Sequence, residues 1–214
     1  TSEGRKVDVK TVERYLDALI ESYIIYPAQR YNVKGKQYLK TLGKYYVVDI
    51  GMRFMLLGKR NTDAGHILEN VIYLELIRRG YDVYMIRETN DVSLSNKKRA
   101  LMANESGAGI LLRIHCNSAD SQSANGALTM SPTSSNPYCK VIAADSQRLS
   151  ECVVSTLCRR TGAKNRGVTQ TDEMTGINWS KIPVTIVEMG FMSNPDEDQK
   201  LSDRHYQTML AEGI

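Results

Sequence analysis

The stretch Thr185-Ile-Val-Glu188-Met-Gly-Phe-Met-Ser-Asn-Pro195 indicates how this chain folds. It is a short apolar, β-like run that ends on one ionisable residue, Glu188, and then breaks into small and polar residues. A second stretch, Leu112-Arg-Ile-His115-Cys-Asn-Ser118, has the same pattern and ends on His115. The carboxyl ends of strands in an α/β sheet are where ligands bind, so the pattern places a His and a Glu for chemistry.

Helical and extended patterns alternate through most of the sequence. The predicted helices cover residues 9–26, 67–79, 95–106, 146–161 and 196–213, and the predicted strands cover 81–86, 109–114, 126–130 and 184–187. This order predicts an α/β fold with a mostly parallel sheet flanked by helices. The polar segments 118–125 and 165–180 are predicted to be loops beside strand ends, where substrate contacts usually lie.

Composition is that of an ordinary globular protein, with 214 residues of which 42% are hydrophobic and 24% charged. No run approaches the ~20 apolar residues of a membrane span, and no signal-peptide pattern opens the chain. The net charge of +4 comes from residues 1–86, with 14 Lys/Arg against 10 Asp/Glu, whereas residues 87–214 carry 14 of each. We interpret the excess as a solvated basic face, with a mild attraction to polyanions as the alternative, and nucleic acid is not an expected partner. The four cysteines have no CxxC spacing and are expected to be free thiols.

The first part of the chain has a different character. After the first helix comes a basic stretch with a turn at residues 31–40, and then the β-rich run 44–49; a helix followed by a basic hairpin is how a winged-helix module ends. Three phrases give residues 1–80 a resemblance to the winged-helix and nuclease-like region that follows the ATPase core in a family of bacterial AAA-type ATPases: Gly35-Lys-Gln-Tyr-Leu-Lys-Thr, Tyr46-Val-Val-Asp-Ile-Gly and Gly65-His-Ile-Leu-Glu-Asn-Val-Ile-Tyr-Leu-Glu-Leu. No GxxxxGK[ST] loop occurs and the residues that complete the nuclease motif are missing, so neither activity is expected.

Residues 81–214 resemble zinc-dependent N-acetylmuramoyl-L-alanine amidases, which are bacterial peptidoglycan hydrolases. The likeness is carried by the two stretches quoted first and by shorter phrases and single positions: Asn165-Arg-Gly-Val168, Met192-Ser-Asn-Pro195, Arg87 and Asn104. The resemblance implies that His115 is a zinc ligand, that Glu69 is the helix Glu of the family's zinc site, and that Glu188 is the catalytic carboxylate. In such a site zinc lowers the pKa of water to about 7, and a nearby carboxylate moves a proton to the departing amine.

The chain departs from this family at its first zinc-binding His. Where the family has Asp-x-Gly-His, this sequence has Asp49-Ile-Gly-Met52, and a thioether is a poor zinc ligand. Glu69 and His115 alone would hold zinc weakly. His66 lies three residues before Glu69 on the same helix face and is a candidate third ligand, or it caps and packs the first helical turn. Glu69 also has an alternative role, as a carboxylate favoured by the helix dipole.

The chain is therefore predicted to be a chimera whose sequence join lies near residue 80. Structurally, residues 1–44 are expected to form a winged-helix-like segment and residues 45–214 an amidase-like domain, with Tyr45–Ile50 taking the place of the first strand of the sheet. Trp179 is interpreted either as a packing anchor or as a ring that stacks on sugar or peptide.

Two functional hypotheses follow. The first is zinc-dependent cleavage of the N-acetylmuramoyl-L-alanine amide of peptidoglycan or muropeptides, with a metal site impaired at Met52. The second is a non-catalytic relative that binds cell-wall fragments, or a basic module that binds DNA or a partner. The resemblance implies work at the cell envelope or outside the cell, and the sequence does not indicate an oligomeric state.

Overall fold

The computed structural model describes residues 8–28, 31–32, 37–38, 44–48, 64–86 and 93–214. The chain divides into two compact units, Thr1–Arg60 and Asn61–Ile214. The boundary predicted from the sequence, between residues 44 and 45, lies earlier in the chain. Each unit is considered by itself.

The described part of the N-terminal unit is a helix followed by two short antiparallel strand pairs. Its elements are α1 (Val9–Glu21), β1 (Ile25–Ala28), β2 (Tyr31–Asn32), β3 (Gln37–Tyr38) and β4 (Lys44–Val47). β1 pairs with β4, and β2 pairs with β3. The helix ends before the predicted residue 26 because Tyr23 takes a left-handed backbone conformation, φ 55°, which an α-helix cannot continue through. A helix followed by short strands was predicted here, but the strand β1 was not, and the winged helix stays a prediction.

The prediction that Tyr45–Ile50 joins the sheet of the C-terminal unit is wrong. Its described part, in β4, pairs with β1 and places Tyr46 opposite Tyr26, and Tyr46 is almost fully buried. An apolar run predicts that a strand will be buried but does not identify its partner. An antiparallel partner close in sequence can be reached through a short connection, whereas a parallel partner needs a long crossover.

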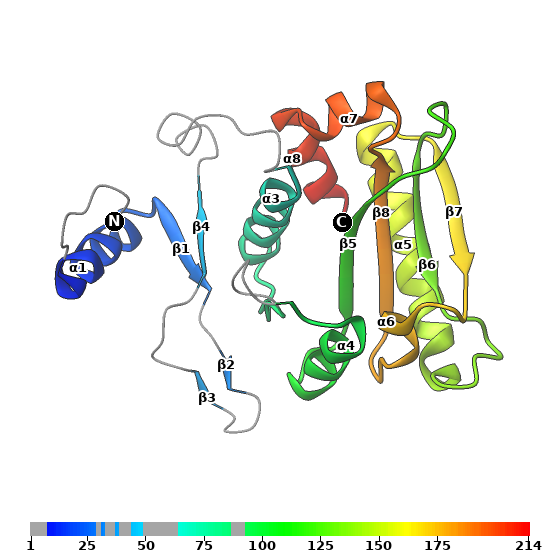
Figure 1. Ribbon diagram of the computed structural model, residues 1–214, viewed down its shortest axis with the longest axis horizontal. Helices are drawn as coiled ribbons and strands as arrows, with labels where there is room; N and C mark the ends of the chain where they lie inside the picture. The colour runs from blue at the N-terminus through cyan, green and yellow to red at the C-terminus, as the bar shows by residue number, and fades with distance from the viewer. Residues whose placement is uncertain (1–7, 29–30, 33–36, 39–43, 49–63, 87–92) are drawn as a thin grey trace. The chain divides into compact units, whose positions relative to one another are not determined.

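The C-terminal unit is built around one four-stranded sheet with the strand order β5-β8-β6-β7 (Figure 1). Its strands are β5 (Leu111–Asn117), β6 (Ala127–Ser131), β7 (Asn165–Gln170) and β8 (Val184–Phe191). Its helices are α3 (Ala64–Arg78), α4 (Asn96–Glu105), η2 (Lys140–Ile142), α5 (Ala143–Thr161), α6 (Thr175–Asn178), α7 (Pro195–Leu201) and α8 (Arg204–Gly213). β5 is parallel to β8 and β6 is parallel to β7, whereas β6 and β8 are antiparallel. The predicted α/β fold with a mostly parallel sheet flanked by helices is confirmed.

Three local predictions in this unit were wrong. Residues 81–86 form no strand, β7 lies inside the predicted loop 165–180, and the predicted last helix is two helices. The break in that helix falls at Asp203, whose carboxylate accepts a hydrogen bond from the backbone N–H of Tyr206 at 2.9 Å and so caps α8. A residue that caps a new helix competes with continuation of the old one, which apolar periodicity does not reveal.

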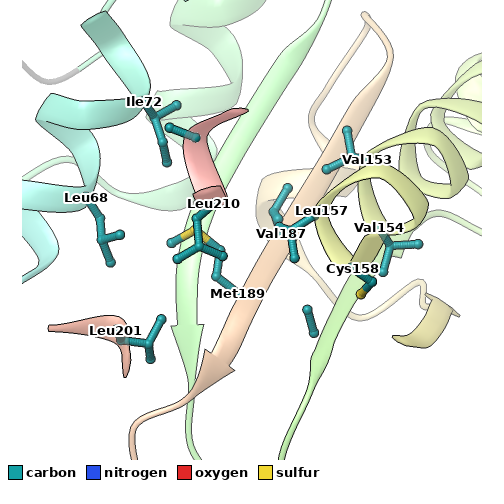
Figure 2. Packing of buried hydrophobic residues seen from close by; sticks show 12 residues of the cluster. Leu68, Ile72, Val153, Val154, Leu157, Cys158, Val187, Met189, Leu201 and Leu210 are labelled. Carbon is teal, nitrogen blue, oxygen red and sulfur yellow. The ribbon is translucent and has the colours of Figure 1, made fainter. Parts of the chain in front are cut away.

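β8 supplies the centre of the core because its alternate residues pack on opposite faces of the sheet. Val187 and Met189 belong to a cluster with side chains of α3, α5, α7 and α8: Leu68, Ile72, Val153, Val154, Leu157, Cys158, Leu201 and Leu210 (Figure 2). Val184 and Ile186 belong to a second cluster on the other face, with side chains near α4, η2 and α6: Ala103, Leu111, Cys139, Ile142 and Ile177. Both faces of the sheet are therefore covered.

Among the helices described here, none is long and apolar enough to cross a membrane. All four cysteines are free thiols.

Candidate active site

His115 and Glu188 lie side by side on the sheet. They are register partners on the parallel strands β5 and β8, and on its other side Glu188 pairs with Leu128 of β6. Neighbouring strands are about 4.8 Å apart, and paired residues project from the same face. Both residues lie inside their strands, which continue to Asn117 and Phe191, and not after the strand ends as the sequence suggested.

The Glu188 carboxylate is in an unusual environment. Its Oε2 atom is buried and, among the residues that the structure describes, has no hydrogen-bond partner. Burial raises the pKa of Glu188, and the positive charge of Arg113 opposes that shift. A carboxyl group with one oxygen free of hydrogen bonds, which also holds its proton more readily than usual, suits a proton-transfer role.

His115 is exposed enough to meet a ligand, but its ring is also partly surrounded by protein. Burial lowers the pKa of His115, and the charges of Arg113 and Arg99 lower it further. The imidazole is therefore kept neutral near pH 7, the form that accepts a hydrogen bond or binds a metal. The thiol of its neighbour Cys116 is not a competing nucleophile, because burial raises the pKa of Cys116 to about 11.

Arg113 lies on the same face of β5 as His115, two residues earlier, and pairs with Ile186. Its guanidinium donates a hydrogen bond to Oδ1 of Asn96 at 2.8 Å. It also occupies the space beside Gly176 of α6, where an added Cβ would lie 1.4 Å from Nη1 of Arg113. The missing side chain of Gly176 thus makes room for the arginine next to the His115–Glu188 pair.

Residues after β8 hold the loop 118–125 at the edge of this site. Oε1 of Glu197 accepts a hydrogen bond from the backbone N–H of Gly126, and Oε2 accepts one from that of Phe191, both at 2.8 Å. The Ser193 hydroxyl accepts from the N–H of Ala119 at 3.0 Å, and the Asn194 side chain donates to the carbonyl of Ala124 at 3.2 Å. Glu197 thus joins the start of β6 to the end of β8.

The local sequence explains why Glu197 lies in this position. The Asn194 side chain caps α7 by accepting from the N–H groups of Asp196 and Glu197, Pro195 follows it, and acidic residues fill the first turn. Each of these choices favours a helix start at this point. The segment Met192-Ser-Asn-Pro195, which carries part of the resemblance to amidases, therefore has a structural role as a helix cap.

Of the other two predicted zinc ligands, Glu69 and His66, the structure describes the side chain of Glu69 alone. Glu69 is half-buried on α3, whose Leu68 and Ile72 pack in the cluster on the opposite face of the sheet. His66 lies in the first turn of α3, but its side chain lies outside the described part of the structure, as do Met52 and Arg87. Their predicted roles remain predictions.

Asn104 and Trp179 contribute to packing at the other end of β8. The Asn104 amide donates to the carbonyl of Trp179 at 2.9 Å and accepts from the N–H of Lys181 at 2.7 Å. The Lys97 ammonium lies 3.5 Å from the centre of the Trp179 ring. Trp179 follows α6 and precedes the start of β8, whereas Glu188 lies further along that strand. These contacts favour the packing role of Trp179 over stacking on substrate at the site.

The described residues offer only part of a zinc site. Burial and two arginines lower the pKa of His115, and its strand neighbour Glu188 has a carboxyl oxygen without a partner among the described residues; this combination suits a metal-assisted reaction. Within residues 64–86, 93–214 and the described parts of the N-terminal unit, however, no three His, Cys, Asp or Glu side chains gather as a metal-binding group. The described donor set is therefore incomplete for zinc, whose sites usually have three or four protein ligands.

Sequence reasoning missed two contributors to this site. Arg113 lies between two apolar residues of a strand. Because it precedes His115 by two positions, the sequence already indicated that both side chains lie on the same face of the sheet. Glu197 was hidden in an acidic helix start, where a carboxylate is expected for the dipole alone. Its hydrogen bond with Gly126 joins residues far apart in sequence, and no local sequence pattern indicates it.

Comparison with known proteins identifies a family for most of this chain. Residues 63–214 match the N-acetylmuramoyl-L-alanine amidase family. The chain belongs to this family. The match begins before α3, so the helix with Glu69 lies in the amidase part, earlier than the predicted join near residue 80. Residues 2–63 match a second family, a domain of unknown function (DUF8612), and the likeness to AAA-type ATPases stays a prediction.

Individual amidases are similar to this chain in sequence and in structure. The amidase LytC of Bacillus subtilis is 32% identical over 168 residues, which make up 73% of this chain and 32% of LytC. The structure of an amidase from Clostridium difficile 630 has a TM-score of 0.57 and 27% identity, covering 74% of this chain and 82% of that one. Ami1 of Mycobacterium abscessus has a TM-score of 0.64 over 90% of this chain and 88% of its own, and at 18% identity this likeness shows the fold alone. The chain spans about a third or less of the length of the first curated relatives it matches.

Proposed function

We propose that the C-terminal unit hydrolyses the amide between the lactyl group of N-acetylmuramic acid and L-alanine in peptidoglycan, at the face of the sheet that carries His115 and Glu188. The observation that carries this proposal is the pairing of these two residues with a buried Glu188 oxygen that has no hydrogen-bond partner. Membership of the amidase family supports the substrate class. The site of action that goes with such a substrate is the cell envelope.

Glu188 is the proposed proton carrier. Its carboxylate accepts a proton from the water that attacks the amide carbonyl, as the new C–O bond forms. It then delivers that proton to the alanine nitrogen as the C–N bond breaks, which leaves a free lactyl carboxylate and an amine. The raised pKa of Glu188 matches both halves of this transfer, because a general acid–base group works best when its pKa lies near the working pH.

His115 is the proposed zinc ligand of the sheet, with Glu69 as a second ligand. A bound zinc ion supplies Lewis-acid catalysis at the carbonyl and lowers the pKa of water. The neutral state of His115 is the state that coordinates a metal. Because Met52 stands where the family has a ligand His, we expect weak zinc binding and low activity, unless His66 replaces the missing ligand.

The test is release of the L-alanine amine from purified peptidoglycan by the full chain with added zinc. We expect slow cleavage that Glu188→Gln abolishes, since Gln cannot carry the proton, and that Met52→His increases clearly. Glu151→Gln is the matched control, because Glu151 is exposed on α5, and it should leave the rate unchanged.

A different pattern would point to the non-catalytic hypothesis. If neither the natural chain nor Met52→His cleaves peptidoglycan, the amidase proposal is wrong. Sedimentation of the chain with insoluble peptidoglycan would then show whether it still binds cell-wall fragments.

A further inference from the structure

Two arginines lie close to the His115–Glu188 pair. Arg113 is on β5, and Arg99 is on α4, where its Nε donates to the carbonyl of Leu94 at 3.0 Å. Both side chains are partly buried. Arg113 donates a hydrogen bond to Asn96, the first residue of α4, and Arg99 lies three residues later, on the same face of that helix. The two arginines therefore share one neighbourhood, and their charges act on His115 as well.

The position of Arg113 is fixed before any ligand binds. Its guanidinium donates to the neutral Asn96 side chain at 2.8 Å and fills the space beside Gly176. An arginine held in one orientation loses little conformational entropy when it binds an anion, so its planar donor group is preorganised.

The local charge is out of balance. In the described part of the chain, neither Arg99 nor Arg113 takes part in an ion pair closer than 4.0 Å. Glu188 is near enough to influence Arg113 electrostatically, but its buried Oε2 makes no hydrogen bond, so the two do not form a hydrogen-bonded pair through that atom. Two like charges held close together in a partly buried place repel each other, and a bound anion would relieve that repulsion.

We propose that Arg99 and Arg113 form a subsite for a carboxylate on the peptide side of the scissile amide, an inference that rests on the proposed function. The lactyl carboxyl of the sugar is consumed in the amide itself, so a carboxylate near the reacting bond belongs to the peptide. Guanidinium groups bind carboxylates through paired, charge-assisted hydrogen bonds. The subsite would orient the alanine nitrogen toward Glu188, and the chain would prefer acidic peptides to neutral ones.

The test compares two ligands that differ in one charge, N-acetylmuramoyl-L-alanylglycine and its C-terminal amide, in which the alanine carboxyl is in a peptide bond as it is in peptidoglycan. Binding to the full chain is measured by calorimetry with a chelator present, so that no turnover occurs. We expect the carboxylate ligand to bind about tenfold more tightly than the amide. Arg113→Met and Arg99→Met should each reduce this ratio to about twofold. Arg113→Lys keeps the charge without the planar donors and should give an intermediate ratio.

The matched control is Arg148→Met on α5, which removes an exposed arginine whose partner is Asp145 and should keep the full ratio. Equal binding of the two ligands by the natural chain would overturn the subsite, and so would an unchanged ratio in both methionine variants. If Arg113→Met does not fold, the binding ratios of Arg99→Met and Arg113→Lys decide whether the subsite exists.

Failure of the proposed function is recognised separately. If neither ligand binds, the substrate class is wrong, and the anion subsite is judged with inorganic phosphate. Saturable shifts of two arginine Nε–Hε signals in the NMR spectrum, each lost in one variant, would then support the subsite. No shift in any arginine signal would overturn it.

Discussion

Glu188 on β8 pairs with His115 on the neighbouring strand β5, and Leu128 on β6 pairs with Glu188 from the other side. The carboxylate is thus placed between an imidazole and an apolar side chain, with one oxygen buried and without a partner. A polar atom in that state costs free energy of folding, and such costs are often found at functional sites. The same residue is therefore expected to influence both stability and chemistry.

Glu188→Gln should stabilise the protein at pH 7 but not at low pH. Folding raises the pKa of Glu188. The stability that this shift contributes is therefore fully present when the pH is below the unfolded-state pKa, and it is lost as the pH rises through the folded-state pKa. At pH 7 the variant should gain ~1 kcal/mol, or roughly 2–4 °C in Tm. Below about pH 4 the two proteins should unfold alike. Fluorescence of Trp179, the single tryptophan, follows this transition, and equal Tm values at pH 7 would contradict the cost assigned to the buried carboxylate.

Met52→His should restore zinc binding. It supplies the imidazole that the sequence resemblance predicts for an amidase at this position, and changes in the outer shell of metal sites alone alter affinity by roughly 10–100-fold. We expect a gain of at least this size in calorimetric titrations with zinc. His115→Ala should remove binding from both proteins. If the natural chain already binds zinc tightly and loses it in His66→Ala, then His66 is the third ligand and Met52 is not the cause of an impaired site.

Glu197→Ala should destabilise the C-terminal unit by about 2–4 kcal/mol, because it leaves the N–H groups of Gly126 and Phe191 without their acceptor. Glu197→Gln has one acceptor oxygen and should lose about half as much. The exposed neighbour Asp198 is the control, and Asp198→Ala should change stability by less than about 0.5 kcal/mol. Urea unfolding measures all three, and similar losses in the Glu197 and Asp198 variants would show that the two hydrogen bonds do not matter.

Gly176→Ala should displace Arg113, since the new Cβ would lie 1.4 Å from Nη1 of the guanidinium. We expect a loss of about 1–3 kcal/mol, typical of overpacking. In an Arg113→Ala background the same change should cost much less, which a double-mutant cycle measures as coupling. Gly109→Ala serves as the control because no atom lies within 4 Å of its added Cβ. Equal costs of Gly176→Ala in both backgrounds would contradict the contact.

Local patterns in the sequence predicted much of the C-terminal unit and less of the N-terminal one. Apolar periodicity and Ser95, whose side chain caps α4, place helices within a few residues because those signals act over one or two turns. They do not report strand partners, so β4 was assigned to the wrong sheet.

The candidate site shows the same division. The strand pattern identified His115 and Glu188, and the fold brings them together. Arg113 is positioned by its contact with Gly176, and Glu197 by its hydrogen bond with Gly126. Each contact joins segments that are distant in sequence. No short stretch contains that information.

The strand order has a consequence for how the protein is made. β5 pairs with β8, and β6 and β7 are synthesised between them. During translation the strand with His115 leaves the ribosome before β8 (Val184–Phe191) has been made, so β5 stays unpaired with β8 until those later residues emerge. Pairing across such a sequence distance is slow and exposes apolar segments to association with other chains. Chaperone dependence and low yields at high expression rates are the expected signs of this delay.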